Sequence, residues 1–183
     1  MKKLMMTLSA VLCCTALFNS CNKTNSQKQE EEKPDTTPVF VQATFTYYGT
    51  DDMFEIADIT GIFNDGTGEK TEPVNTVNWT KTVTATLPAT LSFGRTVKLK
   101  EGIELSNDRG YTYTRNFNID YVPLNAKGEE IKNMWGNRNS IISPNTLNGK
   151  QLAVILESHR LDVTHTFKFD KDGVLLINSG DEE

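Results

Sequence analysis

From Val39 onward, apolar and polar residues alternate with a period of two along several stretches of the chain. In residues 39–47 an apolar or aromatic side chain holds every odd position, and Gln42, Thr44 and Thr46 hold even positions between them. This period is typical of strands with one buried face, and threonine enrichment favours the same assignment. The strands expected from the pattern are 39–47, 54–63, 79–87, 91–99, 111–121, 163–169 and 174–177. Short alternating strands predict a mainly β domain over residues 39–183, an antiparallel β-sandwich of the immunoglobulin-like or a similar type.

Two segments depart from this pattern. Residues 123–150 lose the alternation and are expected to form a long connection. Residues 152–157 fit either a buried strand or a short helix. Asn148 followed by Gln151 has the spacing of a helix N-cap and its partner, so we expect one short helix near residues 148–158. The turn Asp170-Lys171-Asp172-Gly173 separates the last two strands and predicts a hairpin.

The N-terminus has the order of an export signal. Lys2 and Lys3 precede a mostly apolar stretch, residues 4–18, and then come Ser20 and Cys21. The stretch is shorter than the ~20 residues that a membrane-spanning helix needs. A cysteine directly after the cleavage point marks a bacterial lipoprotein signal, and an ordinary secretory signal is the alternative. We therefore expect residues 1–20 to be removed and Cys21 to be lipidated, so that the lipid attaches the protein to a membrane.

Residues 22–38 are polar and carry no large apolar side chain, so we expect a lipidated, disordered tether over 21–38. The net charge of the whole chain is −5, and removal of Lys2 and Lys3 with the signal changes it to −7. An acidic balance of this size argues against nucleic-acid partners and against attachment to anionic lipid by charge. Membrane attachment is then expected to come from the acyl chains on Cys21.

The tether also carries a resemblance. The cleavage motif Phe18-Asn19-Ser20-Cys21 and the acidic run Glu30-Glu31-Glu32 resemble those of outer-membrane lipoproteins of the Bacteroidetes group. The resemblance implies outer-membrane residence and leaves open whether the protein faces the periplasm or the cell surface. Asp35-Thr36-Thr37 is similar to the O-glycosylation pattern of that group, with Thr36 as the candidate acceptor. The resemblance covers residues 1–37 and does not extend to the domain behind them.

The usual catalytic signatures do not occur in the sequence. Once the signal is removed, Cys21 is the single cysteine, which excludes an intrachain disulfide and a cysteine nucleophile in the domain. His159 and His165 are the two histidines, and their spacing is not that of a metal pair, so we expect neither a metal nor a cofactor. The alternative of a glycan-active hydrolase remains open, because its two carboxylates can lie far apart in the sequence.

Three charged residues hold positions that the alternation assigns to buried faces. Asp58, Arg95 and Arg115 share the parity of the apolar residues in their expected strands. A buried, unpaired guanidinium is costly, so we expect Asp58 to pair with Arg95 or Arg115. Two alternatives are a bulge that turns one arginine outward and a site for an anionic ligand.

Trp135 lies in a polar loop without alternation, Asn133-Met134-Trp135-Gly136-Asn137. Loops carry function more often than scaffold strands do. We expect Trp135 to fold down over the core. The alternative is that its side chain remains exposed as a binding residue.

Together these features predict a lipid-anchored cell-envelope protein with a non-catalytic binding or surface-interaction module for a glycan or a protein. The alternatives are the hydrolase and a structural subunit that assembles through edge strands.

Overall fold

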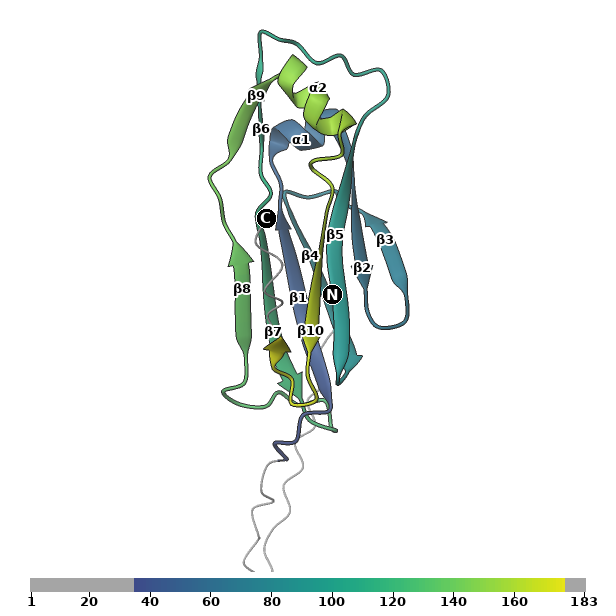
Figure 1. Ribbon diagram of the computed structural model, residues 1–183, viewed down its shortest axis with the longest axis vertical. Coiled ribbons are helices and arrows are strands. Elements are labelled where there is room, and N and C mark those ends of the chain that lie inside the picture. Colours follow the sequence, from purple (N-terminus) through teal and green to yellow (C-terminus); the bar gives the residue numbers. More distant parts are fainter. Residues whose placement is uncertain (1–34, 177–183) are drawn as a thin grey trace, which may run out of the picture. The chain divides into compact units, whose positions relative to one another are not determined.

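The computed structural model describes residues 35–176, which form two antiparallel β-sheets packed face to face (Figure 1). The mainly β, sandwich-like fold expected from the alternation is confirmed. The signal 1–20, Cys21 and the tether up to residue 34 lie outside the described residues. No helix in the described part of the chain is long and apolar enough to cross a membrane.

The first sheet has four strands in the order β4-β1-β7-β8. All neighbouring pairs are antiparallel. The strands are β1 (Phe40–Tyr48), β4 (Asn78–Thr86), β7 (Phe117–Leu124) and β8 (Gly136–Ser140). Because β8 lies at one end of this order, one of its edges has no partner strand among residues 35–176.

The second sheet has five strands in the order β11-β10-β5-β2-β3, and its neighbours are again antiparallel. Its strands are β2 (Ala57–Asn64), β3 (Glu69–Pro73), β5 (Ala89–Leu99), β10 (Val163–Phe169) and β11 (Leu175–Leu176). A separate two-stranded sheet pairs β6 (Gly110–Tyr113) with β9 (Asn145–Asn148). The hairpin expected at residues 170–173 is present, and Asp170 Oδ1 accepts hydrogen bonds from the N–H groups of Asp172 and Val174.

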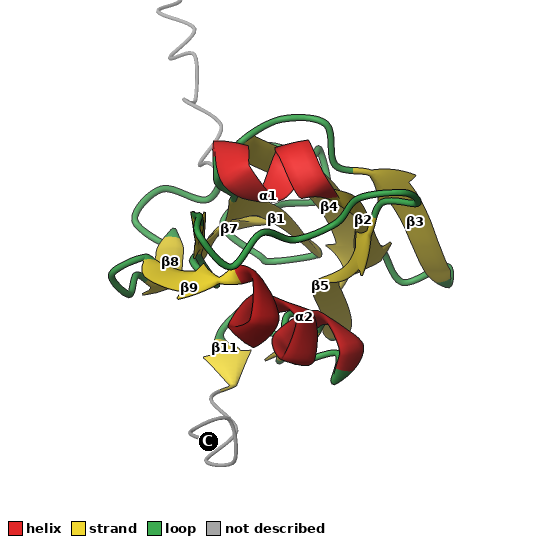
Figure 2. Cartoon of the chain, turned by 90° about the horizontal axis from the view of Figure 1, so that it is seen from above, coloured by secondary structure: helices red, strands yellow, loops and turns green. Residues whose placement is uncertain are grey.

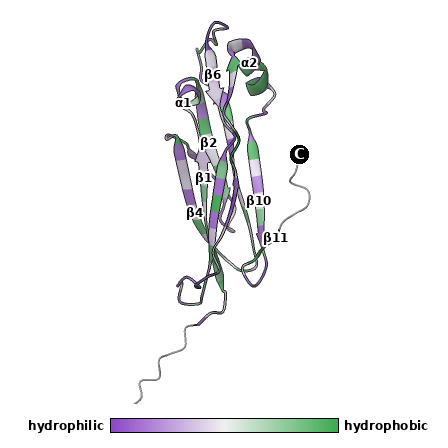
Figure 3. Cartoon of the chain, turned by 90° about the vertical axis from the view of Figure 1, so that its left-hand side faces the viewer, coloured by the Kyte–Doolittle hydropathy of each residue, from purple (hydrophilic) through white to green (hydrophobic). Residues whose placement is uncertain are grey.

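Aromatic rings from both sheets fill the space between them. The ring of Phe45 on β1 stacks on that of Phe93 on β5, with centroids 4.9 Å apart. Trp79 on β4 packs against Gly61 on β2, where an added Cβ would lie 2.5 Å from the indole. Glycine at position 61 is therefore what lets the two sheets approach here. Figure 3 shows the alternation of hydrophobic and hydrophilic residues along the strands that produces this core.

The two helices lie at the same end of the sandwich (Figures 1 and 2). The helix α2 (Gly149–Glu157) resolves the ambiguity of residues 152–157 and confirms the short helix expected near 148–158. Its capping box is complete: Asn148 Oδ1 accepts from Gln151 N at 3.0 Å, and Gln151 Oε1 accepts from Asn148 N at 3.2 Å. Leu152 and Leu156 bury its inner face.

The other helix corrects the second expected strand. Residues 54–56 belong to α1 (Asp51–Ile56), and the strand begins only at Ala57. Thr50 is its N-cap, because its hydroxyl accepts from Met53 N, and two acidic residues occupy the first turn. These are favourable signals for a helix start. The change of period from helix to strand moves the inward-facing positions of β2 by one residue.

The expected strand 111–121 is likewise two strands in different sheets, β6 and β7. The break lies at residues 114–116, where Thr114 is buried and its hydroxyl accepts from Asn116 N. The expected long connection at 123–150 contains β8 and β9. The short strand β3 was also missed, since its sequence Glu-Lys-Thr-Glu-Pro has no apolar alternation.

Candidate functional site

Amide and hydroxyl side chains occupy most of the outward positions of the four-stranded sheet. At its β7–β8 end, four residues form the feature that we call the amide platform: Asn118, Asp120, Asn137 and Asn139. Their positions follow from register, since Asn118 lies opposite Asn139 and Asp120 lies opposite Asn137. Directly opposed side chains on one face of a sheet are close enough to interact.

Hydrogen bonds connect all four members of the amide platform. Asn137 Nδ2 lies 2.6 Å from both Asn118 Oδ1 and Asp120 Oδ1. Asn118 Nδ2 donates to Asp120 Oδ2 at 2.7 Å, and Asn139 Nδ2 donates to Asn137 Oδ1 at 3.2 Å. These bonds hold the side chains in fixed orientations. Each carboxamide has two donors and two acceptor lone pairs, so the exposed platform keeps capacity for further hydrogen bonds.

The polar face continues across β1 and β4. Thr44 and Thr82 share a hydrogen bond of 2.9 Å, and Gln42 Nε2 donates to Thr84 Oγ1 at 3.5 Å. Threonines occupy the outward positions of β4 at 80, 82, 84 and 86, and all four are exposed. Among these polar side chains Asp120 is the one acidic residue, so the face carries little charge although the net charge of the chain is −5.

Trp135 adjoins this platform. Its side chain is 73% exposed, so it does not cover the core, contrary to the favoured expectation. It directly precedes β8, the strand that carries Asn137 and Asn139, and one residue separates it from Asn137. Gly136, the first residue of β8, lies opposite Tyr121, and an added Cβ at this position would be 2.2 Å from the Tyr121 ring. The result is an exposed indole at one end of an ordered polar lattice.

Among residues 35–176, Arg95 is the one charged residue that is buried, 2% exposed between the sheets. Its Nη2 donates to the Thr114 carbonyl at 2.9 Å and its Nε to the Leu161 carbonyl at 3.2 Å. The guanidinium lies over the Tyr47 ring, 3.7 Å from the centroid, while Nη1 has no hydrogen-bond partner in the described part of the chain. Burial lowers the pKa of Arg95 to about 10, and burial also raises the pKa of Tyr47.

The expected pairing of Asp58 with Arg95 or Arg115 is wrong. Asp58 is exposed on the outer face of the second sheet, opposite Lys98, because β2 begins after α1 with the shifted alternation. Arg115 is exposed at the break between β6 and β7, which is the alternative of an outward-turned arginine. Arg95 is held by two carbonyl groups and an aromatic ring instead of a carboxylate. The structure thus separates Asp58 from both arginines.

Arg115 instead lines a groove at the side of the sandwich, which we call the side groove. It has a volume of about 380 Å³ and lies between β10 and the β7–β8 edge. Arg138 on β8 also lines it, and the walls include Phe117, Phe167 and Ile142. Neither Arg115 nor Arg138 forms an ion pair within the described part of the chain. The side groove is therefore cationic and carries no acidic residue in its lining.

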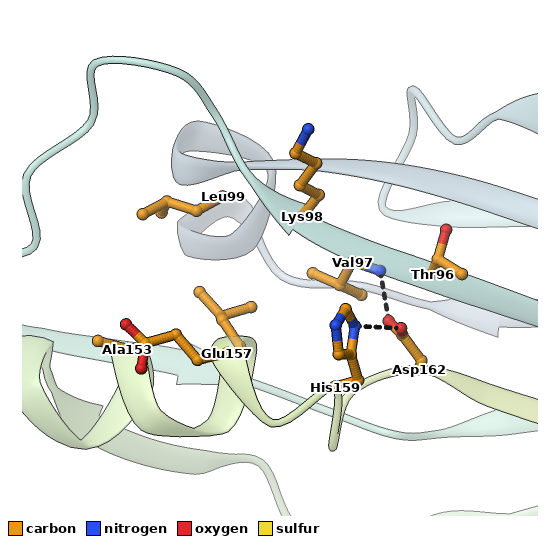
Figure 4. Close-up of a pocket in the computed structure, with 9 residues that line it drawn as sticks. Thr96, Val97, Lys98, Leu99, Ala153, Glu157, His159 and Asp162 are labelled. Carbon is orange, nitrogen blue, oxygen red and sulfur yellow. Dashed lines mark hydrogen bonds and ion pairs between the residues drawn. The ribbon is translucent and has the colours of Figure 1, made fainter.

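A second groove, the helix groove, lies between α2 and the end of β5 (Figure 4). Its volume is about 470 Å³, and Val97, Leu99, Ala153 and Leu156 give it an apolar floor. Asp162 closes one end: its Oδ1 accepts from Val97 N at 2.8 Å and its Oδ2 lies 2.9 Å from His159 Nδ1. Glu157 is the other carboxylate of the lining. Because Asp162 accepts a hydrogen bond from the backbone N–H of Val97 on β5, its carboxylate has a structural role at this strand.

His165 and Thr36 are the remaining candidate residues. His165 lies half-buried with its ring 4.0 Å from that of Phe117, on the apolar face where the sequence placed it. Thr36 is exposed, as an acceptor for modification needs to be. Within residues 35–176, no group of three or more metal-ligating side chains is close enough to hold a metal ion.

Comparisons of the chain with protein-family models, with curated proteins and with solved structures found no match.

The residues of the amide platform were missed in the sequence, and their strand gives the reason. β8 is Gly-Asn-Arg-Asn-Ser and contains no apolar residue, so period-two hydrophobicity cannot reveal it. The available signal was the repeated spacing of two, Asn118 with Asp120 and Asn137 with Asn139. Such spacing places both members of each pair on one face if the segment is a strand.

Proposed function

We propose that this protein is a lipid-anchored, non-catalytic module that binds a neutral glycan on the amide platform beside Trp135. The observation that carries the proposal is a hydrogen-bonded lattice of amides, exposed at Asn137 and Asn139, on the strand that directly follows Trp135, whose side chain is 73% exposed. The lipid anchor on Cys21 and residence in the outer membrane are part of the proposal and rest on the N-terminal sequence.

The chemistry of the platform suits sugar hydroxyls. A hydroxyl group both donates and accepts, and a carboxamide offers both partners on one planar group. Fixed side chains lose less conformational entropy on binding than free ones, which favours a lattice whose members already hold one another. Because the face is nearly neutral, it offers little electrostatic attraction for a strongly charged ligand. A pyranose ring can also pack its C–H face on an exposed indole, which has a large apolar surface and a polar N–H.

The rival hypothesis is a glycan hydrolase. Such enzymes use two carboxyl groups that flank the scissile bond. The amide platform has one carboxylate, Asp120, and both of its oxygens accept hydrogen bonds from asparagines. The helix groove has two carboxylates, Glu157 and Asp162, but Asp162 already accepts a hydrogen bond from Val97 N. Binding is therefore the better supported activity, and Glu157→Gln tests the rival.

Affinity electrophoresis through gels that contain single neutral polysaccharides tests the proposal. We expect at least one polysaccharide to retard the protein, and Trp135→Ala to weaken binding about tenfold or more, as truncation of a central aromatic typically does. Ile141→Ala is the matched control, since Ile141 is 70% exposed just beyond the other end of β8. Equal retardation of both variants, or none of the wild type on any gel, refutes the proposal. Glycan turnover lost in Glu157→Gln would establish the hydrolase instead.

A further inference from the structure

Two continuous rows of polar side chains run across the outer face of the first sheet. Where β4, β1, β7 and β8 all pair, the register leaves two sets of four outward positions, and both sets are wholly polar. The first row, in strand order, consists of Thr80, Thr46, Asn118 and Asn139. The second row consists of Thr82, Thr44, Asp120 and Asn137. We call the two rows together the polar track; the amide platform is one half of it, and the threonines of β1 and β4 are the other half.

The strands give the polar track a defined length and width. Neighbouring strands of a sheet are about 4.8 Å apart, so a row across four strands extends over about 14 Å. Successive outward positions of one strand are about 7 Å apart, which is the separation of the two rows. Val122, the next outward residue of β7, is apolar and bounds the track on one side. The track is therefore longer than it is wide, and it runs perpendicular to the strands.

Hydrogen bonds within the polar track orient its side chains and leave capacity for a ligand. Thr44 and Thr82 share a bond of 2.9 Å in the second row. Asn137 Nδ2 lies 2.6 Å from Asp120 Oδ1 in the same row, and Asn118 Nδ2 donates to Asp120 Oδ2, which links the two rows. A hydroxyl has one donor and two acceptor lone pairs, and a carboxamide has two of each. A ligand that lies along the track therefore meets hydrogen-bonding groups at every strand.

The shape of the polar track suits an extended chain better than a chain end. Sites for small molecules are usually concave, whereas the track lies on the face of a sheet, and Asn139 is its one member that also lines the side groove. In a β-1,4-linked pyranose chain the advance per sugar is close to the spacing of strands, and hydroxyl groups project from both edges of the flat ribbon. Two parallel polar rows can contact both edges at once. An α-1,4-linked chain coils and leaves a straight row after a short distance.

We propose that the ligand of the amide platform is an internal stretch of a linear, neutral, β-1,4-linked polysaccharide that lies across all four strands along the polar track. This inference rests on the proposed glycan function and adds to it the linkage, the direction and the length of the bound chain. The length of the track corresponds to about three or four sugar units. A chain of uronic acids would be repelled by Asp120, the one charged residue of the two rows.

Isothermal titration calorimetry of the full chain with cello- and manno-oligosaccharides of two to six units tests the length. We expect the dissociation constant to fall at least about tenfold from two units to four, because each added hydrogen bond contributes a factor of about two to ten. Beyond four units it should change less than about twofold, since the added sugars extend past the track. Malto-oligosaccharides contain the same sugar as cello-oligosaccharides in the α-1,4 linkage, and the longer ones should bind about tenfold more weakly.

Substitutions at the β4 end separate the polar track from the amide platform alone. Thr80→Val with Thr82→Val removes one hydroxyl from each row and keeps the β-branched shape that suits a strand. We expect this double variant to bind cellohexaose or mannohexaose about tenfold more weakly, and the disaccharide, which the amide platform holds alone, less than about twofold more weakly. Thr86→Val is the matched control, because Thr86 is exposed on the same strand but lies opposite Phe40, outside both rows. It should leave both dissociation constants unchanged.

The outcomes distinguish this inference from the proposed function. If no polysaccharide retards the protein in affinity electrophoresis, the glycan function itself is refuted. If a polysaccharide retards it but neither the cello- nor the manno-series binds, the β-1,4 linkage is wrong and the glycan function stands. Affinity that does not depend on chain length, equal binding of the malto-series, or an equal loss in Thr86→Val would likewise overturn the strand-crossing chain alone. Loss of binding after the reducing end of the hexasaccharide is converted to an alditol would show recognition of a chain end and overturn it as well.

Discussion

Replacing Arg95 tests whether a buried cation can be held by carbonyl groups and an aromatic ring alone. Burial lowers the pKa of Arg95 from 12.5 to about 10, which corresponds to about 3 kcal/mol against the charged form at neutral pH. Two carbonyl hydrogen bonds and the Tyr47 contact oppose that cost. Arg95→Met removes the charge and the cost of burying it. It also leaves two buried carbonyl groups without a donor, and each unpaired carbonyl lowers the unfolding free energy by about 1–3 kcal/mol.

Arg95→Lys, which preserves the charge, should therefore lower the unfolding free energy more than Arg95→Met does. Arg95→Lys keeps a cation in the same buried position, and an ammonium is more strongly hydrated than a guanidinium. It also loses the planar fork that reaches two carbonyls and the stacking on Tyr47. We expect losses of unfolding free energy of about 2 kcal/mol for Arg95→Met and about 3–4 kcal/mol for Arg95→Lys.

Urea denaturation followed by tryptophan emission measures both losses, because Trp79 is 6% exposed and reports the core. The dependence on pH adds a second check. Burial lowers the folded-state pKa of a lysine below its ordinary value of about 10.4. At pH values between these two pKa values the unfolded state binds more protons than the folded state. The unfolding free energy of the lysine variant should therefore rise as pH increases toward 10. The wild type should change little up to about pH 10, where its own folded-state pKa lies. A milder effect of lysine than of methionine would refute this reasoning.

Two further substitutions, the second with a matched control, test local structure. Asn148→Ala removes the capping box shared with Gln151 and should lower the unfolding free energy by about 1 kcal/mol in urea denaturation; an unchanged midpoint would contradict the cap. Asp52→Ala should cost about 1 kcal/mol because its carboxylate accepts from Thr112 N at 2.7 Å, whereas Asp58→Ala, on the exposed face, should stay within about 0.5 kcal/mol. That same hydrogen bond lowers the pKa of Asp52, so its contribution should be lost as pH falls below the ordinary carboxyl range. Equal thermal shifts for the two variants would contradict the assignment.

The alternation predicted the long strands because each buries one face against the opposite sheet. β1, β4, β5 and β10 begin and end within a few residues of the expected positions. Short strands without an apolar face, such as β8, gave no such signal. Their formation depends on hydrogen bonds to a neighbouring strand, which is a property of the tertiary structure.

The pairing of Asp58 with Arg95 or Arg115 was predicted wrongly because the alternation was extended across the end of one element into the next. Asp58 was counted from residues 54 and 56, which belong to α1, and Arg115 was counted through the break between β6 and β7. Arg95 lies within the continuous strand β5, and its buried position follows the alternation. Period-two reasoning thus held where one strand was unbroken. The turn residues Thr50-Asp51-Asp52 carried the missing information, since they are also an N-cap and an acidic first helical turn.

The side-chain amide resonances of the platform give the most direct measurement of the proposed glycan site. In ¹H–¹⁵N spectra the Nδ2 groups of Asn118 and Asn137, and the indole N–H of Trp135, are separate reporters, whereas Asn139 also lines the side groove and does not distinguish the two sites. Titration with an oligosaccharide of the polysaccharide that retards the protein should shift these signals together, with one common dissociation constant. The Nδ2 signal of Asn75, in the loop after β3, should remain unchanged. Shifts confined to the side groove or the helix groove, with the platform signals unmoved at saturation, would contradict the account.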